Sequence, residues 1–375
     1  MGKKVFEFIN SGKNSKILEC DSNMNIILTL KCDFKDAFYF IQQIASLKTV
    51  EKVFVFRDEK CLDADKIKYI VSKSLRLRKI SFIIRFLQMV LDTRYKPQIF
   101  IGIYEIPHGL LAMLSGKVRK IPSVVSIIGN PAYTKLRRGL RLKLTMWILK
   151  NCNYITVTGN NSRKYLIQQR IPGEKIFILP NTLDFTLFRK LGPNKEYDII
   201  SLGRISEEKH IEIIVKIVAE LKAKVPNIKA AIGGNGPQKE MVINLVKQLK
   251  LDQNIDVCGF IPDEELTSFF NKGKIFLLTS ETEGFPRTII QAAACGLPVV
   301  ASNVGDITDV IDHGINGFLV NEYSNVKEFS SRVFQLLNDH ELYEQFSITL
   351  EKKVKQQFVI ENASKVWQTI FDGIK

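Results

Sequence analysis

Paired cysteines and long apolar runs are both missing from this chain of 375 residues. Six cysteines are spread along it, at Cys20, Cys32, Cys61, Cys152, Cys258 and Cys295. No two form a C-x-x-C pair, so a disulfide framework and a zinc site are both disfavoured, and we interpret them as free thiols. No run of about 18 apolar residues lacks charge, and the first residues lack the apolar core of a signal peptide. We therefore expect a cytoplasmic protein, at most peripheral on the inner face of the cytoplasmic membrane.

Acidic residues are scarce in the first half of the chain. Residues 1–200 carry 35 lysines and arginines against 16 acidic residues, whereas residues 201–375 carry 19 against 23. Such asymmetry indicates that the first half meets an anion, which is nucleic acid, phospholipid or a phosphorylated substrate. The alternative is that a basic surface only keeps the protein soluble. Nucleic acid is disfavoured because no recognition motif is present and the second half is acidic.

Short apolar runs alternate with longer helical stretches, a pattern typical of parallel sheets with crossover helices. Strands are predicted at residues 24–30, 52–57, 98–104, 123–128, 154–158 and 175–179, and then at 197–203, 228–233, 255–260, 275–279, 298–301 and 317–320. Because these runs are almost continuously apolar, we expect both faces of each sheet to be covered. The sequence predicts an α/β protein with two doubly wound, Rossmann-like domains facing across a cleft.

Domain boundaries follow from breaks in this pattern. We expect an N-terminal domain over residues 1–190, with a candidate added hairpin at 1–23. A C-terminal domain is expected over 191–345, followed by helices at 346–375 that pack back toward the N-terminal domain. Ligands of such sheets bind at the carboxyl ends of the strands, so functional motifs should lie in strand-to-helix loops.

Two loops of the second half carry features of an anion site. Gly203 and Arg204 follow one predicted strand, and Lys209 begins the next helix, so charge and free backbone amides together suit a diphosphate. The alternative is that both cations pair with the neighbouring glutamates at the surface. Gly234 and Gly236 follow the next strand, where they permit close backbone approach to a ligand or simply form a tight turn.

The segment from 278 to 302 is the most informative of the chain. Glu283 lies in a loop, Pro286 opens a helix and Gly296 ends it. Arg287 and Gln291 are four residues apart and share one helix face. One short element thus combines a carboxylate, an amide and the positive end of a helix dipole. The alternative makes Glu283 a helix cap and Gln291 a solvated side chain.

These residues resemble a known family, the retaining, nucleotide-sugar-dependent glycosyltransferases of family 4, also called group 1, which have the GT-B fold. The matching positions are Ser280, Glu283 to Phe285, Gly296 to Ser302, Gly203 and Arg204 with Lys209, Gly234 to Pro237, Gly259 to Pro262, Pro180 to Asp184 with Phe188, and Gly314 to Gly317. The resemblance is strong over about residues 175 to 340 and topological in the remainder of the N-terminal half.

The resemblance implies a role for each matched residue. Arg204 and Lys209 would neutralise the donor diphosphate, and Glu283 would contact the donor sugar. The remaining donor-binding candidates are Gly203, Gly234, Gly236, Phe260, Gly284, Phe285, Arg287 and Gln291. Candidates on the acceptor side are His108, Gly129 and Asn130, although His108 is also interpretable as an ordinary loop histidine.

The sequence departs from the family pattern at three places. Gln291 stands where the family has a second carboxylate that grips the ribose, so an amide would accept one hydroxyl without charge assistance. Residues 30–36 replace a glycine-rich first loop. Gly129 and Asn130 follow the strand after which the family often has a histidine.

Retaining chemistry in this family asks little of a protein base, because the diphosphate leaving group can accept the acceptor proton while cations stabilise its charge. The resemblance therefore implies a hexosyltransferase-type enzyme using a UDP- or GDP-linked sugar, with no metal or other cofactor. The acceptor would be a glycan or a polyprenyl-linked or other glycolipid, in bacterial-type cell-envelope polysaccharide or glycolipid synthesis. A non-catalytic partner subunit is the alternative function.

Two basic segments of the first half suit an anionic membrane surface. Residues 66–96 hold nine lysines and arginines against Asp92 alone, and residues 134–147 hold five and no acid. Each such cation near an anionic surface contributes about 1 kcal/mol. Wound as a helix, residues 134–147 place Lys143 on the face of Leu140 and Trp147, so we expect helices that are partly core.

Overall fold

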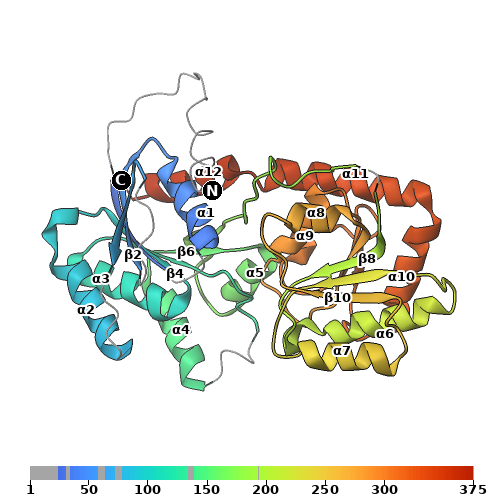
Figure 1. The fold of residues 1–375 in the computed structure, drawn as a ribbon. Helices are drawn as coiled ribbons and strands as arrows, with labels where there is room; N and C mark the ends of the chain where they lie inside the picture. Colours follow the sequence, from blue (N-terminus) through green and yellow to red (C-terminus); the bar gives the residue numbers. More distant parts are fainter. Residues whose placement is uncertain are drawn as a thin grey trace.

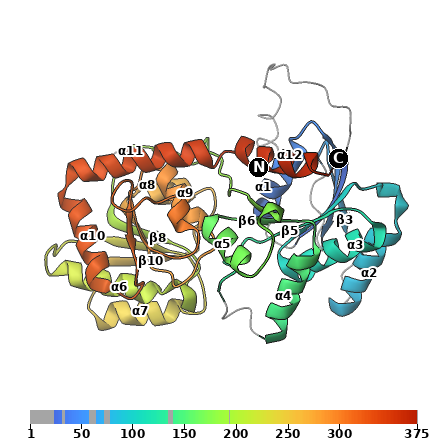
Figure 2. The same cartoon turned by 180° about the vertical axis from the view of Figure 1, so that it is seen from behind.

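Two parallel sheets, each with helices on both faces, form the molecule (Figures 1 and 2). The computed structural model describes residues 24–30, 34–57, 64–71, 78–133, 139–192 and 194–374. The predicted α/β fold with two doubly wound domains is confirmed. The candidate hairpin at 1–23 and the centre of the altered first loop, residues 31–33, lie outside the described residues.

The N-terminal sheet has seven strands in the order β3-β2-β1-β4-β5-β6-β7, and all neighbours pair in parallel. Their bounds are β1 Met24–Thr29, β2 Val50–Arg57, β3 Ile67–Val71, β4 Ile99–Ile103, β5 Ser123–Ser126, β6 Tyr154–Val157 and β7 Ile176–Ile178. The strand order reverses between β1 and β4, so the carboxyl ends of these strands form the switch point where ligands of such sheets bind.

Strand β3 was not predicted from the sequence. It lies at the edge of the sheet, and its side chains alternate between buried and exposed, with Lys68 pointing outward. An edge strand covered on one side only lacks the continuous apolar run that identified the central strands. Part of the basic segment at 66–96 therefore forms sheet rather than helix.

The C-terminal sheet has six strands in the order β10-β9-β8-β11-β12-β13, again all parallel. Their bounds are β8 Tyr197–Leu202, β9 Ala230–Gly233, β10 Ile255–Gly259, β11 Gly273–Leu278, β12 Val299–Ser302 and β13 Phe318–Val320. Its switch point lies between β8 and β11, and all six strands were predicted within a few residues of these bounds.

Helices cover both sheets. The N-terminal sheet is covered by α1 Phe34–Ala45, α2 Arg78–Leu91, α3 Leu110–Arg119, α4 Gly139–Asn151 and α5 Asn160–Gln168. The C-terminal sheet is covered by α6 Ile211–Lys222, α7 Lys239–Gln248, α8 Leu266–Asn271, α9 Arg287–Ala294, α10 Val326–Asn338 and α11 His340–Gln357, and the last helix is α12 Ile360–Asp372. None of the described helices has the length and apolarity needed to cross a membrane.

The last two helices join the domains along one side (Figure 1). Helix α11 packs on α9 of the C-terminal domain, whereas α12 packs on α1 of the N-terminal domain. Trp367 of α12 is fully buried in the N-terminal core, and its indole donates to the Gln43 side chain at 3.3 Å. The chain thus crosses between domains at residues 358–360, later than the start of the helical tail expected at 346.

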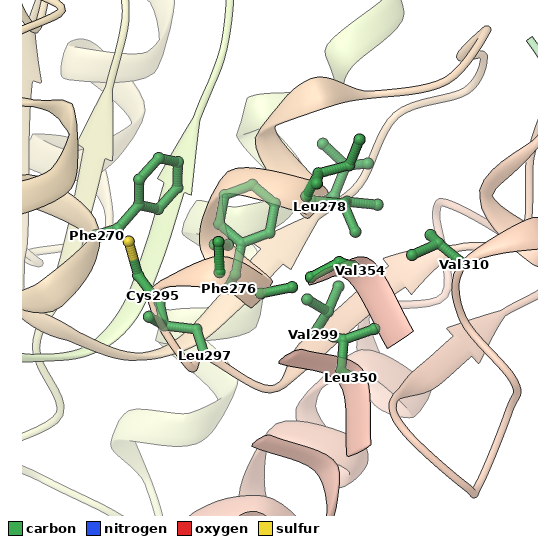
Figure 3. Packing of buried hydrophobic residues seen from close by; sticks show 14 of the residues in the cluster. Phe270, Phe276, Leu278, Cys295, Leu297, Val299, Val310, Leu350 and Val354 are labelled. Carbon is green, nitrogen blue, oxygen red and sulfur yellow. The ribbon is translucent and has the colours of Figure 1, made fainter. Parts of the chain in front are cut away.

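An apolar cluster beside α9 and β11 supports one face of the C-terminal sheet (Figure 3). Phe276, Cys295, Val299 and Leu350 of this cluster are each at most 1% exposed. Burial raises the pKa of the Cys295 thiol to about 12. Close packing here fixes α9, whose N-terminal end follows the loop after β11.

Candidate functional site

Loops at the carboxyl ends of β8, β9, β10 and β11 carry the sequence-predicted donor residues. Hydrogen bonds tie the loop after β8 to the loop after β11: the Thr279 hydroxyl donates to the His210 carbonyl at 3.0 Å, and the Glu281 amide donates to the Glu208 carbonyl at 2.9 Å. The two segments therefore hold a fixed register, which brings Lys209 beside Glu283.

Lys209 and Glu283 form an ion pair. The Lys209 ammonium donates to Glu283 Oε1 at 2.5 Å, and the Ser280 hydroxyl donates to the same oxygen at 2.7 Å. Their side chains are 22% and 8% exposed, respectively. A charge-assisted bond between partly desolvated groups is shorter and stronger than a neutral one. The two residues that the sequence assigned to the diphosphate and the sugar are thus adjacent in the folded chain.

Arg204 remains exposed in the same loop. Among the described residues, neither Arg204 nor Lys209 forms an ion pair with Glu207 or Glu208. The alternative that both cations pair with these neighbouring glutamates is therefore wrong. Burial pushes the pKa of Glu208 up, but bonds from Ser206 and a backbone amide, with the charge of both cations, lower it overall. The loop therefore presents a guanidinium to which no carboxylate of the described ranges is bound.

The glycines after β9 serve backbone packing between adjacent loops. A Cβ on Gly234 would lie 1.8 Å from the Gly203 carbonyl oxygen, and one on Gly236 would lie 2.1 Å from the Ile205 carbonyl oxygen. Gly234 also has a φ of +132°, which disfavours other residues. The sequence interpretation offered a ligand contact or a tight turn, and the structure shows a third reason: the two loops touch through their backbones. No atom lies within 4 Å of a Cβ built on Gly203, so space is open beside this residue.

Helix α9 begins at Arg287, directly after Pro286, as predicted. No side chain caps its N-terminus, which removes the alternative that Glu283 is its cap. Gln291 is 9% exposed, so it is not the solvated residue of that alternative either. Its side-chain amide bonds to no other described residue. A mostly buried side chain whose amide has unused bonding capacity is suited to a hydroxyl-bearing ligand.

Two predicted donor-binding phenylalanines have different environments. The Phe285 ring is buried and packs on Phe358 with centroids 5.1 Å apart, so the side chain belongs to the core and only its backbone is available. Phe260, just after β10, is 72% exposed. An exposed ring at the carboxyl edge of the sheet can stack on a flat ligand group.

His108 lies at the carboxyl end of the N-terminal sheet and is only 2% exposed. Its Nδ1 is 2.8 Å from the Thr29 hydroxyl, at the last residue of β1. This burial is unlike that of an ordinary loop histidine. Gly102 of β4 makes room for the turn that carries His108, because a Cβ there would lie 2.4 Å from the His108 carbonyl oxygen. Sequence reasoning missed Thr29.

The loop after β5 contacts the donor loop after β11. A Cβ on Gly284 would lie 2.4 Å from the Ile128 carbonyl oxygen and 3.0 Å from Gly129 Cα. The Asn130 amide also lies 3.4 Å from the Thr282 hydroxyl. The structure therefore brings the acceptor-side candidates Gly129 and Asn130 directly against the donor-side Gly284.

Further residues position the donor loop. The Asn181 amide, in the segment joining the domains, donates to the Phe285 carbonyl at 3.1 Å. Asn181 was noted only as part of a family motif, without a role. Asp306 donates its backbone N–H to the Gly284 carbonyl at 2.9 Å, and no sequence pattern marked it.

No group of three potential metal ligands among His, Cys, Asp and Glu occurs within the described ranges. A surface cavity of about 560 Å³ lies at the other end of α9, where Cys295, Gly296 and Lys195 line it. That cavity contains none of the predicted site residues. The candidate site is thus the meeting of loops after β5, β8 and β11.

Solved structures with the same fold are known. Anabaena HepE in complex with UDP and glucose superposes with a TM-score of 0.78 at 15% identity, covering 93% of this chain and all of the other. Sucrose-phosphate synthase from Thermosynechococcus elongatus gives 0.77 at 17% identity, covering 94% and 99%. The two domains and their order thus define the class of this protein as GT-B.

Sequence models then give the family. The model of the glycosyl transferases group 1 matches residues 184–353, and that of glycosyltransferase family 4 matches residues 50–187. Together they extend over both domains. The chain belongs to this family of glycosyltransferases, and the resemblance inferred from its motifs is confirmed.

Curated relatives are similar in sequence to part of this chain. An uncharacterized glycosyltransferase of Haemophilus influenzae is 29% identical over 57% of this chain and 60% of its own length. The Bacillus anthracis N-acetyl-alpha-D-glucosaminyl L-malate synthase is 24% identical over 72% of each chain. The 2-deoxystreptamine N-acetyl-D-glucosaminyltransferase of Niallia circulans is 26% identical over 43% of this chain and 41% of its own length. The chain thus spans three fifths or less of several relatives that it matches.

Proposed function

We propose that this protein is a retaining glycosyltransferase that moves a sugar from a nucleotide diphosphate sugar to a glycan or lipid-linked acceptor. The observation that carries the proposal is the contact between Lys209 and Glu283 beside the exposed Arg204, at the carboxyl ends of β8 and β11. Family membership supports sugar transfer, and these residues supply the charges that it requires.

The cations stabilise the leaving group. An ammonium has three donors, and Lys209 uses one on Glu283, so two are available for diphosphate oxygens. Arg204 adds a planar, two-pronged donor that matches phosphate geometry. As the bond from the sugar to the diphosphate breaks, negative charge grows on the leaving oxygen, and both cations stabilise it. That oxygen takes the acceptor proton, so no protein base is needed.

Glu283 orients the donor sugar and also holds Lys209. Its Oε1 accepts from both Lys209 and Ser280, which leaves Oε2 to accept a sugar hydroxyl. Gln291 accepts a ribose hydroxyl in place of the carboxylate usual in the family. The donor is UDP- or GDP-linked, and the chemistry assigned to these side chains uses no metal.

The acceptor reaches the site from the N-terminal domain. This domain carries the basic excess of the sequence, and His108, Gly129 and Asn130 lie at its carboxyl edge. A phosphorylated or lipid-linked acceptor in cell-envelope synthesis fits that charge. His108 is held by Thr29 beneath this edge, with its side chain only 2% exposed.

A panel of nucleotide sugars tests the function directly. Purified full-length protein is mixed with UDP-, GDP- and ADP-linked sugars, and release of the free nucleotide is measured with and without added acceptors. Release from one nucleotide class supports the proposal. Stabilisation by a nucleotide without any release favours the alternative, a non-catalytic partner subunit motivated by Gln291.

An anionic membrane is the proposed working surface. Ile83, Leu87 and Leu91 are spaced four apart on α2 and are 54%, 44% and 68% exposed. Leu140 and Trp147 of α4 are 82% and 45% exposed, seven residues apart on one face. The two helices project from the same side of the domain in both views (Figures 1 and 2).

Exposed cations accompany this apolar surface. Arg141, Lys143 and Lys150 of α4 are exposed, and Lys117 of α3 lies over the Trp147 ring, 5.6 Å from its centroid. Apolar side chains rimmed by cations suit the boundary between headgroups and acyl chains. Sedimentation with anionic vesicles should exceed that with neutral vesicles, and a Leu140→Ser, Trp147→Ser variant should lose the difference. Equal binding to both vesicle types would refute the proposed anionic membrane surface.

A further inference from the structure

The N-terminus of α5 in the N-terminal domain has no cap of its own. Its cap position is Gly159, which has no side chain to accept from the first-turn amides. Unmatched amides at a helix N-terminus ordinarily take a partner from the preceding residue. Here the partners come from the C-terminal domain, almost 150 residues further along the chain.

Asp306 is the main partner. It is fully buried, and its Oδ1 accepts from the Ser162 backbone amide at 2.9 Å. Its Oδ2 accepts from the Ser162 hydroxyl at 2.6 Å and from the Thr158 hydroxyl at 2.9 Å. A buried carboxylate is stable only when bonded in this way. Every partner named here belongs to the N-terminal domain, so Asp306 joins the two domains.

Asp309 and Asn161 extend the same junction. Asp309 Oδ2 accepts from the Asn160 backbone amide at 2.7 Å, and the Asn161 amide donates to the Gly305 carbonyl at 2.7 Å. A Cβ on Gly159 would lie 2.5 Å from Asp306 Cβ, so glycine is needed there. The helix dipole of α5 adds to the attraction of both carboxylates.

The backbone of the same loop holds the donor loop. Besides the bond from the Asp306 amide to the Gly284 carbonyl, Gly305 lies against Glu283: a Cβ on Gly305 would lie 2.0 Å from the Glu283 carbonyl oxygen. Gly305 has a φ of +58°, which lets the chain turn at this point. Asp306 thus contacts α5 through its side chain and the donor loop through its backbone.

We propose that Asp306 is a positioning residue that sets the placement of the Glu283 loop relative to the N-terminal domain, through its bonds to the first turn of α5. The proposal rests on the proposed transfer function. It assigns Asp306 no contact with substrate: loss of its carboxylate lets α5 and the donor loop separate, which misaligns donor and acceptor without removing any donor-binding group.

The test compares Asp306→Ala with Asp339→Ala in the full-length protein. Asp339 is the matched control, because it caps α11 through the Leu342 amide at 3.0 Å within one domain. For Asp306→Ala we expect kcat to fall on the order of tenfold to a hundredfold, since misplacement of about 1 Å has effects of this size. The donor KM and the nucleotide-induced thermal shift should stay within about twofold, and Asp339→Ala should keep the wild-type kcat.

Variants on the other domain keep the test decisive if Asp306→Ala does not fold. Ser162→Ala combined with Thr158→Val removes both hydroxyl donors and should reproduce most of the kcat loss. Asp306→Asn, which retains one acceptor oxygen, should restore part of it. An unchanged kcat in Asp306→Ala, or an equal loss in Asp339→Ala, overturns the proposal.

Hydrogen exchange separates this proposal from the proposed function. The Ser162 amide should exchange about 2- to 30-fold faster in Asp306→Ala, the range that corresponds to loss of one helix cap. This readout requires no turnover. Unchanged exchange at Ser162 refutes the junction even in an active enzyme, whereas faster exchange in a protein without transferase activity refutes only the proposed function.

Discussion

Removal of the Glu283 carboxylate should cost both activity and stability. In Glu283→Ala, Lys209 loses the acceptor that it holds at 2.5 Å and Ser280 loses a partner at 2.7 Å. The Glu283 side chain is only 8% exposed, so its loss should lower the melting temperature as well as the activity.

The size of the effect follows from the burial of the partner left behind. Removing one member of a buried ion pair costs about 3–5 kcal/mol when the other charge stays buried. The Lys209 side chain is 22% exposed and can be hydrated, so we expect about 1–2 kcal/mol instead. At about 2–4 °C per kcal/mol, the Tm should fall by about 2–8 °C.

Calorimetry and a double-mutant cycle check this reasoning. Glu283→Ala and Lys209→Met should each lower the Tm, and the double variant should lose less than the sum of the two, because the ion pair is lost only once. Turnover of the nucleotide sugar should be abolished in both. Additive losses, or a Glu283→Ala protein with wild-type Tm, would refute the role of this pair in the folded chain.

Four other variants or reactions test separate parts of the account. Arg204→Ala should abolish transfer and change the Tm by less than about 1 °C, because the side chain is exposed. Gln291→Glu should keep or improve donor affinity in a nucleotide titration, and a loss of activity would mean that Gln291 contacts something other than ribose. Trp367→Ala should destabilise the N-terminal domain by about 3–5 kcal/mol in denaturant unfolding, since the indole is fully buried. Raising the pH from 7 to 9 should speed thiol alkylation at the exposed Cys258, while Cys295, whose pKa burial raises to about 12, stays unreacted until it unfolds.

Most of the fold was predictable because buried parallel strands are apolar almost throughout. The central strands β1 and β8 were predicted for this reason, and β8 begins at the expected residue. Edge strand β3 was missed because its outward-pointing Lys68 interrupts the apolar run. A continuous apolar run therefore identifies a strand that is buried on both faces, and it does not identify a strand with one exposed face.

Site residues were predictable where a local motif marks them, and unpredictable where only a tertiary contact gives them a role. Glu283 and Lys209 were chosen from local motifs, and the fold places them in contact. The roles of Asn181 and Asp306 arise from tertiary bonds across more than 100 residues, which no local pattern records. Gly234 was assigned to a turn or a ligand, whereas a neighbouring backbone is what requires it.

The central claim is that this chain transfers sugar from a nucleotide diphosphate donor. Its most direct test is the release of nucleotide diphosphate from a panel of UDP- and GDP-sugars by the wild-type protein and by Arg204→Ala. We expect release from one nucleotide class by the wild type and none by Arg204→Ala. No release from any donor, together with no thermal stabilisation by any nucleotide, would contradict the account.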